Sequence, residues 1–154
     1  MKTEFIPYEQ ALALKELGFD EPCFGKWLSF KQSDWKVYEL ILEMGMNEEF
    51  EDNRNFYLRE GACSAPTFSQ VFRWFREKYN ISYSIDWMSR SSEFYNGYYV
   101  HFRGINDNKI NQENFIVLND ELPSKGYKVY KTYEEAELAC LIKLIELVKK
   151  RVLI

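Results

Sequence analysis

Three stretches of this sequence predict helices, over residues 7–18, 66–79 and 133–150. Pro7 suits the first turn of the first helix, and Gly18 can end it. In the second stretch apolar residues occupy one face, while Arg73, Arg76 and Glu77 occupy the other. Between Leu138 and Val148 the third stretch carries only two charged residues. Such a wide apolar arc predicts a helix that is buried along much of its girth, at the centre of the core.

The ends of two of these helices carry specific signals. Gly18 can take the left-handed conformation that ends a helix, which brings Phe19 against Leu14 in a Schellman ending. Thr132 and Glu135, three residues apart, predict a capping box at the start of the last helix. We therefore expect these two boundaries to be set by local sequence.

Strands are indicated by a different period. Apolar and polar residues alternate from Ile81 to Trp87, as in a half-buried strand. Asn96 and Gly97 tolerate positive φ and predict a two-residue hairpin turn, followed by a strand that runs to Arg103. Shorter strands are predicted at residues 24–30, 115–118 and 127–130.

Residues 33–46 are compatible with two structures. Ser33 as a cap and Gly45 after the last turn favour a helix slightly, whereas the aromatic and β-branched residues at 35–40 fit a strand. Residues 47–61, which are rich in acidic side chains, predict an exposed connection.

Together these elements predict an α+β fold. An antiparallel sheet of three to five strands packs against two or three helices, with the C-terminal helix central. At 154 residues, the chain fits a single domain over residues 1–154.

Composition changes this picture only in part. The 12 Phe, 11 Tyr and 4 Trp fit a core rich in aromatic rings. A net charge of −4 argues against a general nucleic-acid binder, which needs an excess of Lys and Arg to neutralise phosphates. The absence of a long apolar run predicts no membrane segment, and three widely spaced cysteines without a disulfide framework favour a reducing cytoplasm.

Three segments occur in an order that carries a resemblance. They are residues 5–24 (FIPYEQALALKELGFDEPCF), 65–79 (APTFSQVFRWFREKY) and 132–140 (TYEEAELAC). In these segments the chain resembles a family of small uncharacterised proteins from gut Bacteroidales genomes, prophages and phages. The resemblance implies a phage or mobile-element context and no catalytic residue. Residues 31–61 and 89–126 fall outside it, which suggests loops specific to this lineage.

Two groups of residues are candidates for binding. Tyr99, His101 and Arg103 should share one side of the strand that ends at Arg103, and aromatic rings interleaved with basic groups can stack on bases or bind nucleotides. Arg73 and Arg76 can form a basic patch on the second helix. The simpler interpretation of both groups is an ordinary solvated face.

Cys63 is the candidate for chemistry, because it lies just before the predicted helix at residue 66 and a helix N-terminus can lower a thiol pKa. His101 is the single histidine and therefore the only imidazole base available. The simpler interpretation is a small buried cysteine without contact to His101. A zinc site made from Cys23, Cys63, Cys140 and His101 would need four distant segments to converge. We predict no catalytic residue, metal or cofactor.

Three functions follow from these observations. The first is a non-enzymatic phage or mobile-element accessory protein that binds a host or phage protein. The alternative is a module that binds and sequesters a small ligand or nucleotide on the Tyr99, His101 and Arg103 side. The second alternative is a cysteine-dependent enzyme.

Overall fold

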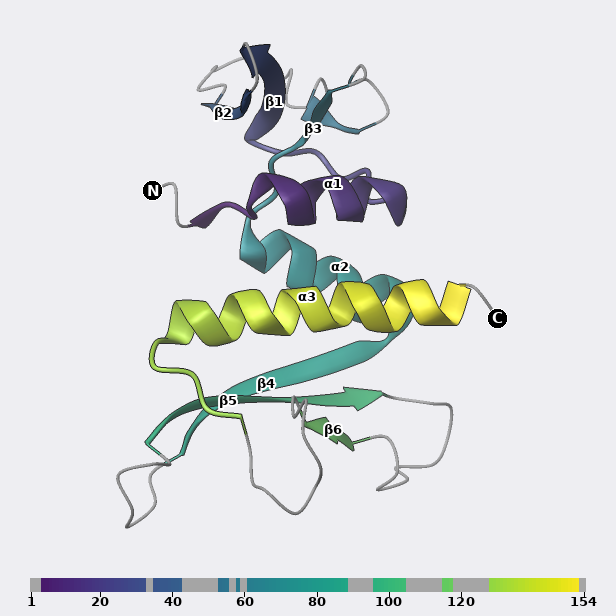
Figure 1. The fold of residues 1–154 in the computed structure, drawn as a ribbon. Coiled ribbons are helices and arrows are strands. Elements are labelled where there is room, and N and C mark those ends of the chain that lie inside the picture. Colours follow the sequence, from purple (N-terminus) through teal and green to yellow (C-terminus); the bar gives the residue numbers. More distant parts are fainter. Residues whose placement is uncertain are drawn as a thin grey trace. The chain divides into compact units, whose positions relative to one another are not determined.

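In the part of the chain that it describes, the computed structural model has three helices and two antiparallel sheets of three strands each, which confirms the α+β class (Figure 1). It describes residues 4–32, 35–42, 53–55, 58, 61–88, 96–104, 115–117 and 128–152. The elements, in chain order, are α1 (Tyr8–Glu16), β1 (Gly25–Gln32), β2 (Trp35–Leu42), β3 (Ala62–Ser64), α2 (Phe68–Tyr79), β4 (Ile81–Met88), β5 (Gly97–Gly104), β6 (Phe115–Val117) and α3 (Tyr133–Val152).

The chain forms two compact units, Met1–Val71 and Phe72–Ile154, and the division between them falls within α2. This division into units does not test the expectation of a single domain over residues 1–154, which stays a prediction. Each unit has its own three-stranded sheet, β2-β1-β3 in the first and β4-β5-β6 in the second.

The first unit is built around α1, whose C-terminal end is as predicted. Gly18 has a φ of 81°. Its N–H donates to the Lys15 carbonyl at 3.0 Å, and the Phe19 N–H donates to the Leu14 carbonyl at 2.9 Å. These are the two hydrogen bonds of a Schellman motif, and the Leu14 and Phe19 side chains are both buried.

The slightly favoured helix at 33–46 is wrong, because residues 35–42 form β2. All eight residues of β2 pair antiparallel with β1, from Gln32↔Trp35 to Gly25↔Leu42. The aromatic and β-branched residues of this segment favour a strand. Its backbone hydrogen bonds are made with β1, a distant partner that the local sequence pattern does not reveal. Residues 33, 34 and 43–46 lie outside the described residues.

The predicted exposed connection at 47–61 is wrong where the structure describes its middle. Asn53 and Asn55 are buried there. Asn55 Nδ2 donates to the Phe19 carbonyl at 2.7 Å, and its Oδ1 accepts from the Ser64 N–H at 2.9 Å. The Ser64 hydroxyl in turn donates to the Asn53 carbonyl at 2.6 Å. Short polar side chains that cap backbone groups explain why this segment is buried without being apolar.

In α2, the helix begins at Phe68 rather than at the predicted residue 66. Thr67 and Gln70 form a capping box, in which the Thr67 N–H donates to Gln70 Oε1 at 3.0 Å and the Gln70 N–H donates to Thr67 Oγ1 at 3.3 Å. The helix ends at Tyr79, and Asn80, the next residue, has a φ of 54°.

The second unit confirms that the C-terminal helix packs on a sheet. Figure 1 shows α3 running along the sheet of β4 and β5. Buried residues of α3 and of β5 form much of the core of this unit: Ala136, Cys140, Leu141, Leu144, Val148, Val100 and Phe102. The predicted capping box is present in part. The Glu135 N–H donates to Thr132 Oγ1 at 3.1 Å, whereas the Glu135 carboxylate accepts from the Lys131 N–H at 3.0 Å.

The predicted two-residue turn at Asn96 and Gly97 is wrong. Gly97 is the first residue of β5 and pairs with Met88 of β4, so the connection between the strands is longer. The need for glycine has another cause. A Cβ on Gly97 would lie 2.4 Å from the Tyr130 carbonyl oxygen. Tyr130 itself forms an isolated bridge with Tyr98 rather than the predicted strand at 127–130.

Candidate functional site

Two faces of the β4-β5 sheet differ in chemistry. One face carries the side chains that pack under the helices, among them Val100 and Phe102. On the other face the cross-strand register pairs polar residues, Ser84 with His101 and Asp86 with Tyr99. The structure thus places Tyr99 and His101 on one side of the sheet, as predicted from the alternation of residues. Their rings are 5.7 Å apart and tilted by 40°.

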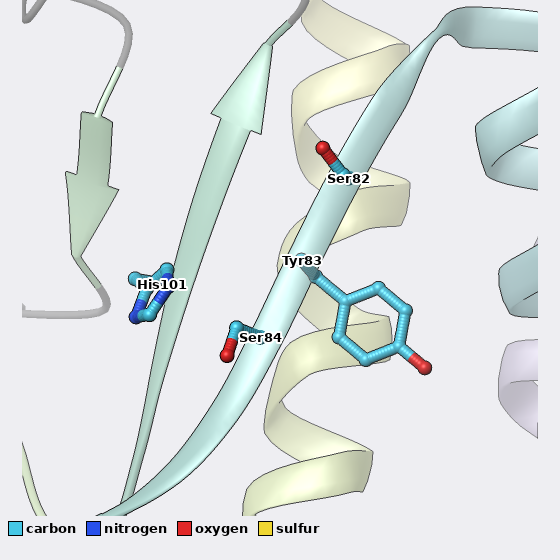
Figure 2. Close-up of a pocket in the computed structure, with 4 residues that line it drawn as sticks. All are labelled: Ser82, Tyr83, Ser84 and His101. Atoms are coloured by element: carbon cyan, nitrogen blue, oxygen red, sulfur yellow. The ribbon is translucent and has the colours of Figure 1, made fainter.

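A hollow of about 200 Å³ opens on this polar face, and Ser82, Tyr83, Ser84 and His101 line it. We call it the polar hollow. Figure 2 shows Ser84 and His101 on neighbouring strands, with the Tyr83 ring directed away from both. That ring stacks on Phe72 of α2, with centroids 4.2 Å apart. The functional groups of the hollow are therefore two hydroxyls and an imidazole.

Asp86 joins two of these groups. The Ser84 hydroxyl donates to Asp86 Oδ2 at 2.6 Å, and His101 Nδ1 lies 3.6 Å from the same oxygen. In a hydrolytic triad the imidazole stands between carboxylate and hydroxyl, and it takes the hydroxyl proton. Here the Ser84 hydroxyl donates its hydrogen bond to the Asp86 carboxylate directly, and the imidazole does not stand between them. The arrangement therefore orients polar groups without activating Ser84 as a nucleophile.

The structure does not gather all of the predicted binding residues in one place. Arg103 lies opposite Ser82 in the register of β4 and β5. Arg73 and Arg76 are exposed on α2, which packs through Phe72 against the other face of the sheet. Arg73 Nε also lies 4.0 Å from Glu77 Oε1. The two arginines of α2 therefore belong to a different surface from His101.

Cys63 does not have the lowered pKa that the sequence suggested. It is fully buried in β3, and burial raises the pKa of its thiol to about 12, against a smaller opposing effect of Lys15. Burial likewise raises the pKa of Cys23 to about 12, and it raises the pKa of Cys140. All three thiols are protonated at neutral pH, whereas a nucleophile must be a thiolate.

An exposed aromatic cluster in the second unit was not predicted. It consists of Trp87, Tyr98 and Tyr133. Trp87 and Tyr98 are cross-strand partners with ring centroids 4.9 Å apart, and Tyr98 meets Tyr133 at 5.6 Å. Trp87 is 56% exposed and Tyr133 is 42% exposed. The alternation of apolar and polar residues placed Trp87 on the apolar face of the strand. It gave no sign that the elements packed on this face leave Trp87 exposed.

Within the described part of the chain, no group of three or more His, Cys, Asp or Glu side chains could hold a metal ion. None of the helices described is long and apolar enough to cross a membrane.

Comparisons of the chain with protein-family models, with curated proteins and with solved structures each give no match. The resemblance to Bacteroidales and phage proteins therefore stays a prediction, and function has to be argued from geometry.

Proposed function

We propose that this chain is a non-enzymatic accessory protein that acts by binding a protein partner, and that the aromatic cluster is the contact surface. The exposure of Trp87 is the observation that carries the proposal. An indole costs free energy when it is left in water, and a solvated Trp beside an exposed Tyr ring is typical of protein interfaces. Trp and Tyr are also the residues most often found at interface hot spots.

The geometry of the cluster supports a binding role. The Trp87 and Tyr98 rings meet at 75°, and the Tyr98 and Tyr133 rings meet at 89°. Edge-to-face contacts of this kind hold each ring in place. Binding to a rigid surface loses little side-chain entropy, which favours affinity. Tyr133 lies at the first residue of α3 and Trp87 near the end of β4, so both are anchored by regular structure.

A cysteine-dependent enzyme is less well supported. The raised thiol pKa of Cys63 opposes the formation of a thiolate, and the residue is fully buried. Because the sequence resembles prophage and phage proteins, we propose that the partner is a host or phage protein in the cytoplasm of a host cell.

The proposal is tested with two variants and a matched control. The tagged full chain is purified from cells that express it, a protein that co-purifies is identified, and its affinity is measured by calorimetry. We expect Trp87→Ala and Tyr133→Ala each to weaken binding by about 30-fold, the effect of a hot-spot residue. Phe24→Ala is the control, because Phe24 is also 56% exposed but lies in the first unit.

Affinity that stays within about twofold in both cluster variants would contradict the proposal, as would the failure of any protein to co-purify. Circular dichroism of each variant separates a lost contact from a lost fold.

A second candidate function, binding of a small ligand, is favoured by a separate observation. The polar hollow contains His101, lies beside Tyr99, and is on the face that sequence analysis assigned to ligand binding. Because it opens on the other face of the sheet from the aromatic cluster, the two functions can be tested independently.

A further inference from the structure

The three rings of the aromatic cluster meet nearly at right angles. Tyr98 contacts both of the others, with the Trp87 ring at 75° to its plane and the Tyr133 ring at 89°. Trp87 is 56% exposed and Tyr133 is 42% exposed, so both rings offer surface to a partner. The face of an aromatic ring carries the negative part of its quadrupole and attracts cations, and Trp does so most strongly. A positively charged side chain is therefore one group that these rings suit.

A carboxylate on α3 adds negative charge beside the cluster. Glu137 follows Tyr133 by four residues, so the two share one face of the helix. Burial is the largest cause of the raised pKa of Tyr133, and the charge of Glu137 is the next. The pKa of Tyr83, which alternation places on the same side of β4 as Trp87, is also raised mainly by burial, and the charge of Glu137 adds to it. Glu137 thus lies close enough to act on both strand and helix, and its charge acts whatever hydrogen bonds its oxygens make.

The other charges at this end of α3 give the same sign. Residues 131–137 contain three glutamates and one lysine, Lys131, which leaves two negative charges. Glu134 and Glu135 lie in the first turn and offset the positive end of the helix dipole. An acidic segment of a partner would be repelled here, whereas a basic segment would be attracted.

We infer that the aromatic cluster receives an arginine side chain of the partner protein, with its guanidinium against the Trp87 and Tyr133 rings and close to Glu137. This inference rests on the proposed function, in which the cluster is the contact surface. Arginine suits the site better than lysine, because its planar guanidinium stacks on aromatic faces and is more weakly hydrated than an ammonium group. An apolar side chain would also cover the rings, but it would gain nothing from the carboxylate.

A short arginine peptide provides the probe. The peptide Ac-Gly-Arg-Gly-Arg-Gly-NH2 is titrated into the isotope-labelled full chain while NMR follows the indole N–H signals, and Trp87→Phe identifies the Trp87 signal by its loss. A second peptide carries citrulline, whose neutral urea group has nearly the shape of a guanidinium. We expect a saturable shift of Trp87 and none of Trp74, which is 6% exposed. The citrulline peptide should bind at least about fivefold more weakly, the effect of a cation on exposed rings.

Glu137→Gln removes the charge with little change in shape and should weaken binding of the arginine peptide about threefold. Glu146→Gln is the matched control, because Glu146 is also exposed on α3. It lies about 13 Å further along the helix axis than Glu137, beyond the Debye length of about 8 Å at physiological salt, and its loss should leave affinity unchanged. Trp87→Leu keeps apolar surface without a ring and should abolish the preference for arginine over citrulline, measured on the backbone amides of Tyr98 and Tyr133.

Three results would overturn the inference: no saturable shift with the arginine peptide, equal affinity for the citrulline peptide, or the same affinity in Glu137→Gln as in Glu146→Gln. Failure of the proposed function is a separate result, in which Trp87→Ala leaves the affinity for the co-purified protein unchanged. If Trp87→Ala weakens that affinity while Glu137→Gln and added salt do not, the contact surface stands and its occupant is uncharged, which contradicts the inference alone.

Discussion

Replacing Asn55 by alanine should destabilise the first unit more than its polar side chain suggests. Asn55 is 8% exposed and joins two segments that are far apart in sequence. Its Nδ2 donates to the Phe19 carbonyl at 2.7 Å, at the end of α1, and its Oδ1 accepts from the Ser64 N–H at 2.9 Å, in β3. The substitution removes both hydrogen bonds at once.

The magnitude follows from what remains after the change. Ser64 is 1% exposed, so its N–H loses its partner in a place that water does not reach. A buried donor without a partner costs about 1–3 kcal/mol, and a hydrogen bond whose loss is partly compensated costs about 0.5–1.5 kcal/mol. Loss of the hydrogen bond to the Phe19 carbonyl is of the partly compensated kind. We therefore expect a loss of about 2–4 kcal/mol in the free energy of unfolding.

Urea denaturation followed by circular dichroism measures this loss, and Asn96→Ala, at an exposed asparagine, is the control. Hydrogen exchange locates it, because the Ser64 amide should exchange faster in Asn55→Ala. The reasoning is refuted if Asn55→Ala loses less than about 0.5 kcal/mol, the usual range for surface substitutions, and the Ser64 amide remains protected.

Three further predictions concern packing, backbone and thiols. Leu144→Ala should cost about 2–5 kcal/mol, because Leu144 is fully buried in α3, whereas Leu12→Ala at a 37% exposed position should cost much less in the same urea assay. Gly97→Ala should destabilise the second unit in thermal unfolding, because the added Cβ would lie 2.4 Å from the Tyr130 carbonyl oxygen, and unchanged stability would contradict the bridge. Burial raises the pKa of Cys63 from 9.0 to about 12. The folded state therefore holds this proton more tightly than the unfolded state, and stability that is complete below pH 9 should fall between pH 9 and about 12. Cys63→Ala should flatten this fall, and an equally steep fall would contradict the assignment.

Local signals in the sequence were enough for several elements of the fold. Gly18 and Phe19 end α1 by hydrogen bonds within a few residues, and Thr132 starts α3 in the same way. Such signals do not depend on distant partners. In residues 35–42 the outcome depends on β1, which lies outside any local window, so the pattern alone left helix and strand close in preference.

The candidate site was predictable only in part for the same reason. Alternation placed Tyr99 and His101 on one side of β5. Which residues of β4 face them depends on the register, and a two-residue turn at Gly97 implies a different register from the observed pairing of Met88 with Gly97. Ser84 and Asp86 were therefore missed as neighbours of His101. The exposure of Trp87 depends on where α3 begins relative to the sheet, which no short stretch of sequence encodes.

The bridge between Tyr98 and Tyr130 has a consequence for the place at which α3 begins. Two backbone hydrogen bonds, at 2.9 and 2.8 Å, join Tyr130 to Tyr98 of β5. Thr132, two residues later, accepts a hydrogen bond from the Glu135 N–H in the first turn of α3. The start of the helix is therefore tied to the sheet through backbone groups. Substitution of either tyrosine by any residue except proline leaves these backbone groups in place, so the attachment of α3 does not depend on the two tyrosine side chains.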